Sequence, residues 1–252
     1  MKKLIALVLA LTLCLGAASA LAADYVIGTD NPFVPFEWID ADGNLVGIDI
    51  ELMEAIAADQ GFTVEWQPVG WDSAIAGCQA GQFDAMIAGA SIKQERIDNG
   101  WHFSDGYYNA GQSMAVAADS AIASLDDMAG KMAVAKIGTE SAAYADELSA
   151  TYGFTVTKVE DDATMYQYVL GGQADAVFND TPILNANITN GVALKVVEGT
   201  ANAGADYGFA IFTAPGEDLS DAQQALMDKF NAGLANVKAN GTYDAILAKY
   251  LN

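Results

Sequence analysis

The stretch from Gly89 to Arg96 combines residue types that can bind an anion. It follows the apolar run Asp84–Ala88, which predicts a buried strand, and Ser91 with Gln94 forms a capping-box pattern for a helix opening at Ser91. A helix N-terminus carries free backbone N–H groups and partial positive charge, which favour an anion. The guanidinium of Arg96 can bind a carboxylate with two parallel hydrogen bonds. The stretch indicates a carboxylate site, and the alternative is a capped helix with a solvated arginine.

Elements that alternate along the chain must position this stretch. Strands and helices follow one another throughout, which predicts α/β architecture with mostly parallel sheets. Ligands gather at the carboxyl ends of such strands, and Asp30, Trp71 and Ser91 each come just after a predicted strand. The turn 138–141 follows the predicted strand Met132–Lys136 and has a glycine and free amides at a helix start. It suits a second anion contact or is an ordinary strand-to-helix turn.

A weak internal echo predicts two similarly built lobes. The pattern Gly-Gln-x-Asp-Ala occurs at 81–85 and again at 172–176, each time after a helix and before an apolar strand. Ser91 and Arg96 follow the strand of the first copy, and Asp180 follows the strand of the second. If the lobes face each other, a cationic clamp meets an anionic one across a cleft. That arrangement suits a molecule with a carboxylate and an ammonium group.

Charge and composition exclude several classes of function. The chain of 252 residues has 33 acidic and 11 basic residues, a net charge of -22. This balance argues against nucleic acid or an anionic membrane as a partner. His102 is the only histidine, so neither a metal cluster nor a Ser-His-Asp site is supported, and we expect no metal and no cofactor. Cys78, in a helical pattern, is interpreted as a buried structural thiol.

The N-terminus has the pattern of a secretory signal. Met1-Lys2-Lys3 precedes the apolar run Leu4–Leu15, and Ala20-Leu21-Ala22 supplies a small-x-small cleavage pattern. We therefore expect residues 1–22 to be removed and the chain to be periplasmic. A lipid anchor on Cys14 is the less favoured alternative.

Several element boundaries can be predicted from local signals. Asp42-Gly43 predicts a hairpin between Glu37–Ile39 and Leu45–Ile48. Asp49 and Asp72 are predicted to cap the helices that follow them. Ser124 is predicted to cap a short helical turn. A strand over Tyr207–Thr213 should return to the first lobe. The final helices, 220–240 and 242–251, carry an apolar stripe for packing on it.

The ordered set of motifs resembles the type II periplasmic solute-binding proteins for polar amino acids, which serve ABC importers. The motifs are Phe33-Val34-Pro35-Phe36-Glu37, Gly47-Ile48-Asp49-Ile50, Asp84-Ala85-Met86-Ile87-Ala88-Gly89, Glu95-Arg96, Phe103-Ser104-Asp105, Tyr107-Tyr108, Gly138-Thr139, Ala174-Asp175-Ala176 and Asn240-Gly241-Thr242-Tyr243. The resemblance covers nearly all of the chain after residue 22. It implies two lobes joined by two hinge strands, with residues 23–109 and 205–252 in one lobe and 110–204 in the other.

The resemblance also implies which part of the ligand each site residue contacts. Arg96 would bind the ligand α-carboxylate, helped by the backbone N–H groups of Ser91 and Glu140. The α-ammonium would be held by the Gly89 carbonyl, the Ser91 hydroxyl and the Asp180 carboxylate. Phe33 and Trp71 would sandwich the side chain. Asp30 and Lys136 match positions that contact the side chain in glutamine binders, and as a pair they fit a carboxamide.

Two positions depart from the glutamine-binding pattern. Glu140 stands where the family has a small or hydroxylic residue, and its carboxylate can turn to solvent, pair with Lys136 or select another ligand group. Asn179 stands where glutamine binders have histidine.

We therefore expect a monomeric, non-catalytic binding protein that captures a free polar amino acid, most like glutamine, and delivers it to an ABC permease complex in the inner membrane. An enzyme resembling the cyclohexadienyl dehydratases, with Glu140 as general acid, is one alternative. A periplasmic sensor that presents its closed form to a separate receptor is another.

Overall fold

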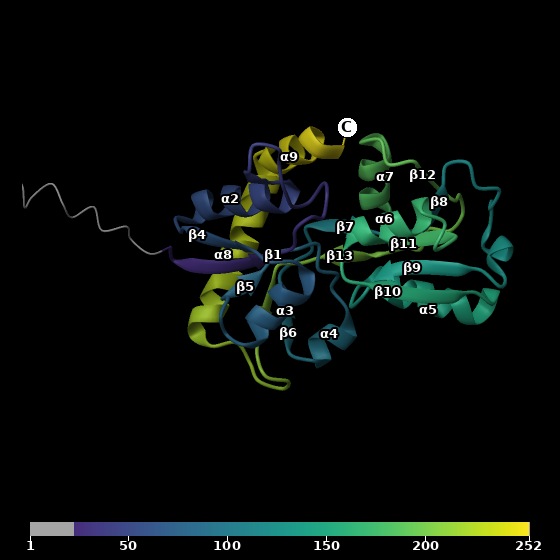
Figure 1. Cartoon of the computed structure of the whole chain (residues 1–252). Helices are drawn as coiled ribbons and strands as arrows, with labels where there is room; N and C mark the ends of the chain where they lie inside the picture. Colours follow the sequence, from purple (N-terminus) through teal and green to yellow (C-terminus); the bar gives the residue numbers. More distant parts are fainter. Residues whose placement is uncertain (1–22, 252) are drawn as a thin grey trace, which may run out of the picture.

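The computed structural model describes residues 23–251, which form two α/β lobes (Figure 1). The predicted signal peptide, residues 1–22, lies outside the described residues. The first lobe is built on a five-stranded sheet with the spatial order β4-β1-β5-β14-β6. Its strands are β1 (Tyr25–Thr29), β4 (Val64–Pro68), β5 (Ala85–Met86), β6 (Trp101–Phe103) and β14 (Ala210–Phe212).

The second lobe repeats this topology with the order β10-β9-β11-β8-β12. Its strands are β8 (Gln112–Ala117), β9 (Met132–Lys136), β10 (Thr155–Val159), β11 (Ala176–Asp180) and β12 (Leu194–Val196). In each sheet three neighbouring strands are parallel, the fourth runs against them and the fifth runs against the fourth. All but one strand of each sheet therefore point the same way, which confirms the predicted two-lobe fold with mostly parallel sheets.

The repeated aspartate of the internal echo has the same role in both lobes. Asp84 precedes β5, and its carboxylate and N–H bond the backbone N–H and carbonyl of Val26 at 2.7 and 2.9 Å. Asp175 precedes β11 and makes the same two bonds to Met132, at 2.9 and 2.7 Å. Each aspartate thus ties the third parallel strand of its sheet, β5 or β11, to β1 or β9.

Two short strands lie where the chain passes between the sheets. β7 (Tyr108–Ala110) pairs antiparallel with β13 (Ala205–Tyr207) in the middle of the molecule (Figure 1). The strand predicted over Tyr207–Thr213 does return to the first lobe, as β14, but it is not continuous: Tyr207 belongs to β13, and Gly208 and Phe209 lie between the two strands. The N–H of Phe209 donates to the Ser104 hydroxyl at 3.0 Å. The lobe boundaries given above remain a proposal, in which β7 and β13 act as the hinge.

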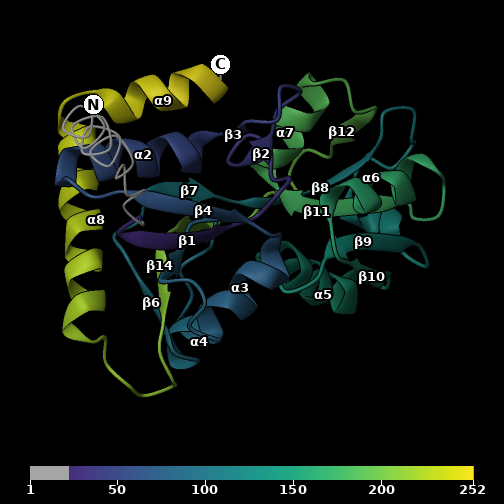
Figure 2. The same cartoon turned by 60° about the vertical axis from the view of Figure 1, so that its left-hand side comes forward.

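Helices cover the sheets of both lobes. The first lobe has α2 (Ile48–Gln60), α3 (Trp71–Gln79), α4 (Gln94–Asp98), α8 (Asp221–Ala239) and α9 (Thr242–Leu251), and the second has the 3-10 helix η1 (Leu125–Met128), α5 (Glu140–Tyr152), α6 (Asp162–Leu170) and α7 (Thr181–Thr189). Figure 2 shows α8 along the side of the first lobe that lies away from the second lobe. Its buried stripe includes Leu226, Phe230 and Leu234, as predicted. None of the described helices is long and apolar enough to cross a membrane.

Three predicted helix caps are wrong. α4 begins at Gln94 with Lys93 as its N-cap residue, and Ser91 instead forms a bridge with Tyr207, so the predicted capping box does not form. α2 and α3 are preceded by Gly47 and Gly70, whose φ angles are 135° and 90°. These left-handed glycines start each helix before the expected aspartate.

Other local predictions are confirmed. β2 (Trp38–Ile39) and β3 (Leu45–Val46) form the hairpin across Asp42-Gly43. Ser124 and Asp127 form a capping box at η1.

The strand before Gly89 is shorter than predicted, because only Ala85 and Met86 pair with neighbours while the chain then turns toward the cleft.

Candidate ligand-binding site

All nine predicted site residues line one pocket between the lobes. From the first lobe come Asp30 and Phe33 after β1, Trp71 at the start of α3, Gly89 and Ser91 after β5, and Arg96 on α4. From the second lobe come Lys136 at the end of β9, Glu140 at the start of α5 and Asp180 at the end of β11. The remaining lining residues are Ala88, Thr139, Ser141 and Asn179. The pocket thus lies at the carboxyl ends of strands from both sheets.

Arg96 is the only arginine in the chain, and its side chain reaches into this pocket. Its guanidinium donates to the Ser91 carbonyl at 2.8 Å and to the carbonyl of Gly138, in the other lobe, at 3.4 Å. It also lies over the Trp71 ring, 5.3 Å from the centroid. Burial lowers the pKa of Arg96, while the charges of Glu140 and Asp180 act in the opposite direction. The geometry fixes a guanidinium at the junction of the lobes.

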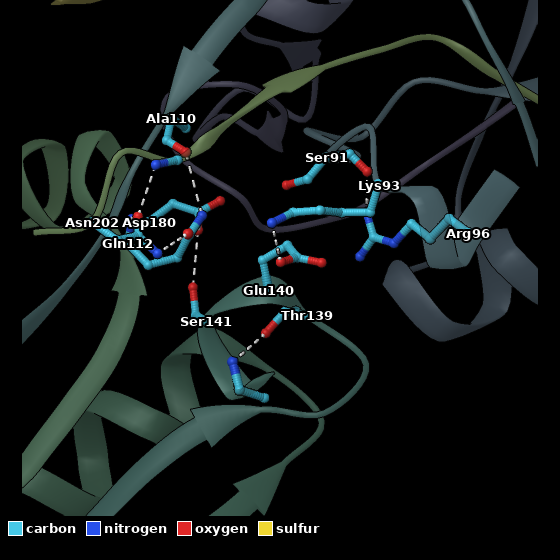
Figure 3. A network of polar contacts seen from close by, with 12 residues as sticks. Ser91, Lys93, Arg96, Ala110, Gln112, Thr139, Glu140, Ser141, Asp180 and Asn202 are labelled. Atoms are coloured by element: carbon cyan, nitrogen blue, oxygen red, sulfur yellow. Dashed lines mark hydrogen bonds and ion pairs between the residues drawn. The ribbon is translucent and has the colours of Figure 1, made fainter. Parts of the chain in front are cut away.

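Asp180 is a buried carboxylate held by donors from three elements. It accepts from Gln112 Nε2 at 2.9 Å and from Ser141 Oγ at 2.9 Å (Figure 3). It also accepts from the hydroxyl of Tyr207. Burial raises the pKa of Asp180, and these hydrogen bonds oppose the rise. Asn202 fixes Gln112 in turn by donating to its Oε1 at 2.8 Å. These hydrogen bonds fix the orientation of the Asp180 carboxylate.

Asp30 and Lys136 form an ion pair that joins the lobes. Both side chains are buried, and the Lys136 ammonium lies 5.7 Å from the centroid of the Phe33 ring. The other Asp30 oxygen accepts from the N–H of Trp71 at 2.9 Å. Burial lowers the pKa of Lys136, but the charges of Asp162 and Asp30 outweigh this and raise it overall. The two groups expected to hold a carboxamide thus contact each other directly.

Glu140 has a partner that sequence reasoning missed. Its carboxylate pairs with the Lys93 ammonium at 2.9 Å, so this ion pair also joins the lobes (Figure 3). Two of the alternatives predicted for the Glu140 carboxylate, an ion pair with Lys136 and a turn toward solvent, are therefore not observed. Lys93 stood inside the stretch singled out from the sequence, but no local pattern could indicate a partner 47 positions away in the other lobe.

Asn179 lines the pocket and contacts Asp162, which is not among the lining residues. Asn179 donates to Asp162 Oδ1 at 3.3 Å and to the Tyr166 hydroxyl at 3.2 Å. The other oxygen of Asp162 is buried and has no hydrogen-bond partner among residues 23–251. Burial raises the pKa of Asp162 to about 7, and the nearby Lys136 ammonium opposes the rise. Sequence reasoning predicted Asp162 only as a possible helix cap, and Asp161 makes that cap.

Comparison with known proteins assigns the family. The chain belongs to family 3 of the bacterial extracellular solute-binding proteins. The family profile matches residues 25–252. The arginine-binding extracellular protein ArtP of Bacillus subtilis (strain 168) is 30% identical over 234 residues, which are 89% of this chain and 85% of ArtP. The lysine/arginine/ornithine-binding periplasmic protein of Escherichia coli (strain K12) is 30% identical over 255 residues, which are 97% of this chain and 96% of that protein.

A solved structure extends the comparison to the fold. An ancestral arginine-binding protein bound to glutamine has a TM-score of 0.79 and 33% identity, covering 90% of this chain and 96% of its own. These three proteins are named for binding and none for catalysis, so the expectation of a non-enzymatic binding protein is confirmed. The family also confirms that the protein acts outside the cytoplasm.

Proposed function

We propose that this protein captures a free amino acid with a neutral polar side chain, glutamine foremost, and delivers it to an ABC importer. The observation that carries the proposal is that Arg96 from one lobe and Asp180 from the other line the same pocket. A guanidinium and an oriented carboxylate match the two ends of an amino-acid zwitterion. The relatives named for amino-acid binding support the same ligand class.

The remaining lining groups complete the backbone contacts of the ligand. The N–H groups of Ser91 and Glu140 would assist Arg96 on the α-carboxylate. The Gly89 carbonyl and the Ser91 hydroxyl would join Asp180 on the α-ammonium. Phe33 and Trp71 would enclose the side chain between them, and both rings are already buried at the pocket.

The Asp30–Lys136 pair favours a neutral side chain over a charged one. A carboxamide can enter between the two groups, because its NH₂ donates to Asp30 while its oxygen accepts from Lys136. Lys136 would repel the cationic side chain of arginine or lysine, and Asp30 would repel an acidic one. The arginine-binding relatives do not weaken this argument, since one ancestral arginine-binding protein of the same fold was solved with glutamine.

Delivery would depend on closure of the lobes. The ion pairs Asp30–Lys136 and Lys93–Glu140 join opposite lobes, so they are available only when the cleft is closed. A ligand that contacts both lobes stabilises the closed form by differential affinity, and the importer would recognise that form. We propose that the mature chain begins at Ala23 and works in the periplasm as a monomer.

Titration calorimetry of residues 23–252 with L-glutamine, L-arginine, L-histidine and L-glutamate tests this function. We expect one site per chain, with glutamine bound most tightly. Arg96→Ala should weaken binding at least about thirtyfold, because removing one partner of a buried charge pair costs about 2–5 kcal/mol. Lys131→Ala removes a cation paired on the surface with Asp175 and should bind as the wild type does. Unchanged affinity in Arg96→Ala would refute the site.

A further inference from the structure

Behind the pocket, two buried acids lie beside each other without the donors that buried carboxylates require. Glu37 and Asp49 are both fully buried. Both oxygens of Glu37 and Oδ1 of Asp49 receive no hydrogen bond from an N–H or hydroxyl group of residues 23–251. A buried polar atom without a partner costs free energy. Burial raises the pKa of both carboxyl groups, so Glu37 can hold a proton and donate it to Asp49, which gives a partner to one oxygen of each acid.

The fourth oxygen of this pair holds the turn that lines the pocket. Asp49 Oδ2 accepts from the N–H of Gly89 at 2.9 Å and from the hydroxyl of Tyr107 at 2.8 Å. Gly89 has a φ of +56°, and a Cβ there would meet the Phe33 ring at 2.6 Å. The turn thus has a left-handed conformation that packs against a pocket ring, and its N–H bonds a buried carboxylate.

The two acids also lie beside the other segments that shape the site. The backbone carbonyl and N–H of Glu37 bond the backbone of Phe33 at 2.7 and 3.1 Å and so close the loop that carries the ring. Tyr107 stands just before the strand β7, and its N–H donates to Tyr207, the residue that holds Asp180. Asp49 therefore sits where the Phe33 loop, the Gly89 turn and the proposed hinge meet.

We propose that Asp49 is a positioning residue for ligand binding: its carboxylate, paired with Glu37, fixes the Gly89 turn so that the Gly89 carbonyl faces the ligand ammonium. The inference rests on the proposed amino-acid site and names a residue outside its lining. Asp49 acts through Gly89 and touches no ligand atom.

The pair also makes binding respond to pH. Burial raises the pKa of Asp49 to about 7, and burial raises the pKa of Glu37 well above its usual range, so Glu37 keeps the shared proton. The other titratable or charged groups that face the pair are Tyr107, Tyr207, Tyr243, Asp30 and Lys136. The three tyrosines have raised pKa values and stay protonated near neutrality.

The sign of the pH effect follows from the charge on Asp49. As pH rises through 7, Asp49 becomes an anion. Its hydrogen bond to the Gly89 N–H lies within the first lobe and is made with or without ligand, so strengthening that bond changes stability and not affinity. The charge of Asp49 also attracts the ligand ammonium, and affinity should therefore be higher at pH 8 than at pH 6.

Calorimetry at pH 6 and pH 8 with L-glutamine, L-arginine and L-histidine as probes separates positioning from simple stability. Asp49→Ala leaves the Gly89 N–H without an acceptor and should lose at least about tenfold in affinity at pH 8. Asp49→Asn keeps an acceptor for Gly89 without the charge. This variant should recover most of that loss in affinity, while the ratio of its affinities at pH 8 and pH 6 falls toward one.

Two controls make the result specific. Tyr107→Phe removes the other donor to the same Asp49 oxygen, and that donor lowers the pKa of Asp49, so the rise in affinity should move to higher pH without disappearing. Burial also raises the pKa of Asp162 to about 7, so the effect of Asp49→Asn must persist in an Asp162→Asn background. Circular dichroism checks that each variant is folded.

The outcomes separate this inference from the proposed function. A wild type that binds none of the probes overturns both. If the wild type binds, two results overturn the positioning role alone. One is that Asp49→Ala binds as tightly as the wild type at pH 8, and the other is that Asp49→Asn keeps the full wild-type ratio of the affinities at pH 8 and pH 6.

Discussion

At the scale of single residues, the proposed function makes Lys136 the residue that selects the ligand side chain. Its ammonium pairs with Asp30, and the charge of Asp162 also acts on it. All three side chains are buried. The two acids would attract a cation, and the Lys136 ammonium already supplies that cation.

Replacing this lysine should therefore change ligand preference. In Lys136→Met the Asp30 carboxylate loses its partner, and a cationic ligand side chain can replace the missing charge. We expect the affinity ratio of arginine to glutamine, measured by calorimetry, to rise at least about tenfold, since one lost charge pair is worth more than about 1.4 kcal/mol in a buried site. Lys93→Met removes the other interlobe lysine and should leave the ratio unchanged. An unaltered ratio in Lys136→Met would remove Lys136 as the selector.

The residue types of the pocket could be predicted from sequence, but their pairing could not. Each of the nine predicted residues lines the pocket, because each follows a strand whose carboxyl end faces the cleft. The contacts Lys93–Glu140 and Asp30–Lys136 depend on how the lobes are oriented, which no local pattern encodes. Their roles toward a ligand stay predictions.

At the scale of elements, helix starts were the weakest predictions and strands were stronger. Met132–Lys136 was predicted with its observed bounds, since both its neighbours and its apolar pattern specify a buried strand. α4 starts three residues after Ser91, because Ser91 pairs with Tyr207 before the helix begins. A tertiary pairing thus overrides a capping pattern that is complete in the sequence.

The aspartate repeated in both lobes allows an element-scale test. Asp84→Ala removes the acceptor for Val26 N–H at the start of β1, and Asp175→Ala does the same for Met132 at the start of β9. Each should lower the free energy of unfolding by about 0.5–1.5 kcal/mol, the value of one hydrogen bond, measured by urea titration. Neither residue lines the pocket, so glutamine affinity should not change. A stability loss in only one lobe would show that the two aspartates are not equivalent.

At the scale of the whole molecule, the proposed function depends on the balance between open and closed forms. Two lobes of like topology meet around β7 and β13, and ion pairs cross between them. Of these pairs, Lys93–Glu140 is the more accessible, with side-chain exposures of 38% and 20%, so it can be removed without emptying a buried site. It is therefore the contact through which closure can be altered while the ligand contacts stay in place.

Breaking this pair should weaken binding by favouring the open form. A partly exposed ion pair contributes about 0.2–1 kcal/mol, so Lys93→Ala and Glu140→Ala should each reduce glutamine affinity by up to about fivefold. The double variant should lose little more than either single one, because both remove the same contact. Added salt should weaken binding by the wild type more than by the double variant. Lys158→Ala breaks a comparably exposed pair with Asp146 inside the second lobe and should bind normally. Losses that add fully in the double variant would mean that the two side chains act independently and that their contact does not stabilise closure.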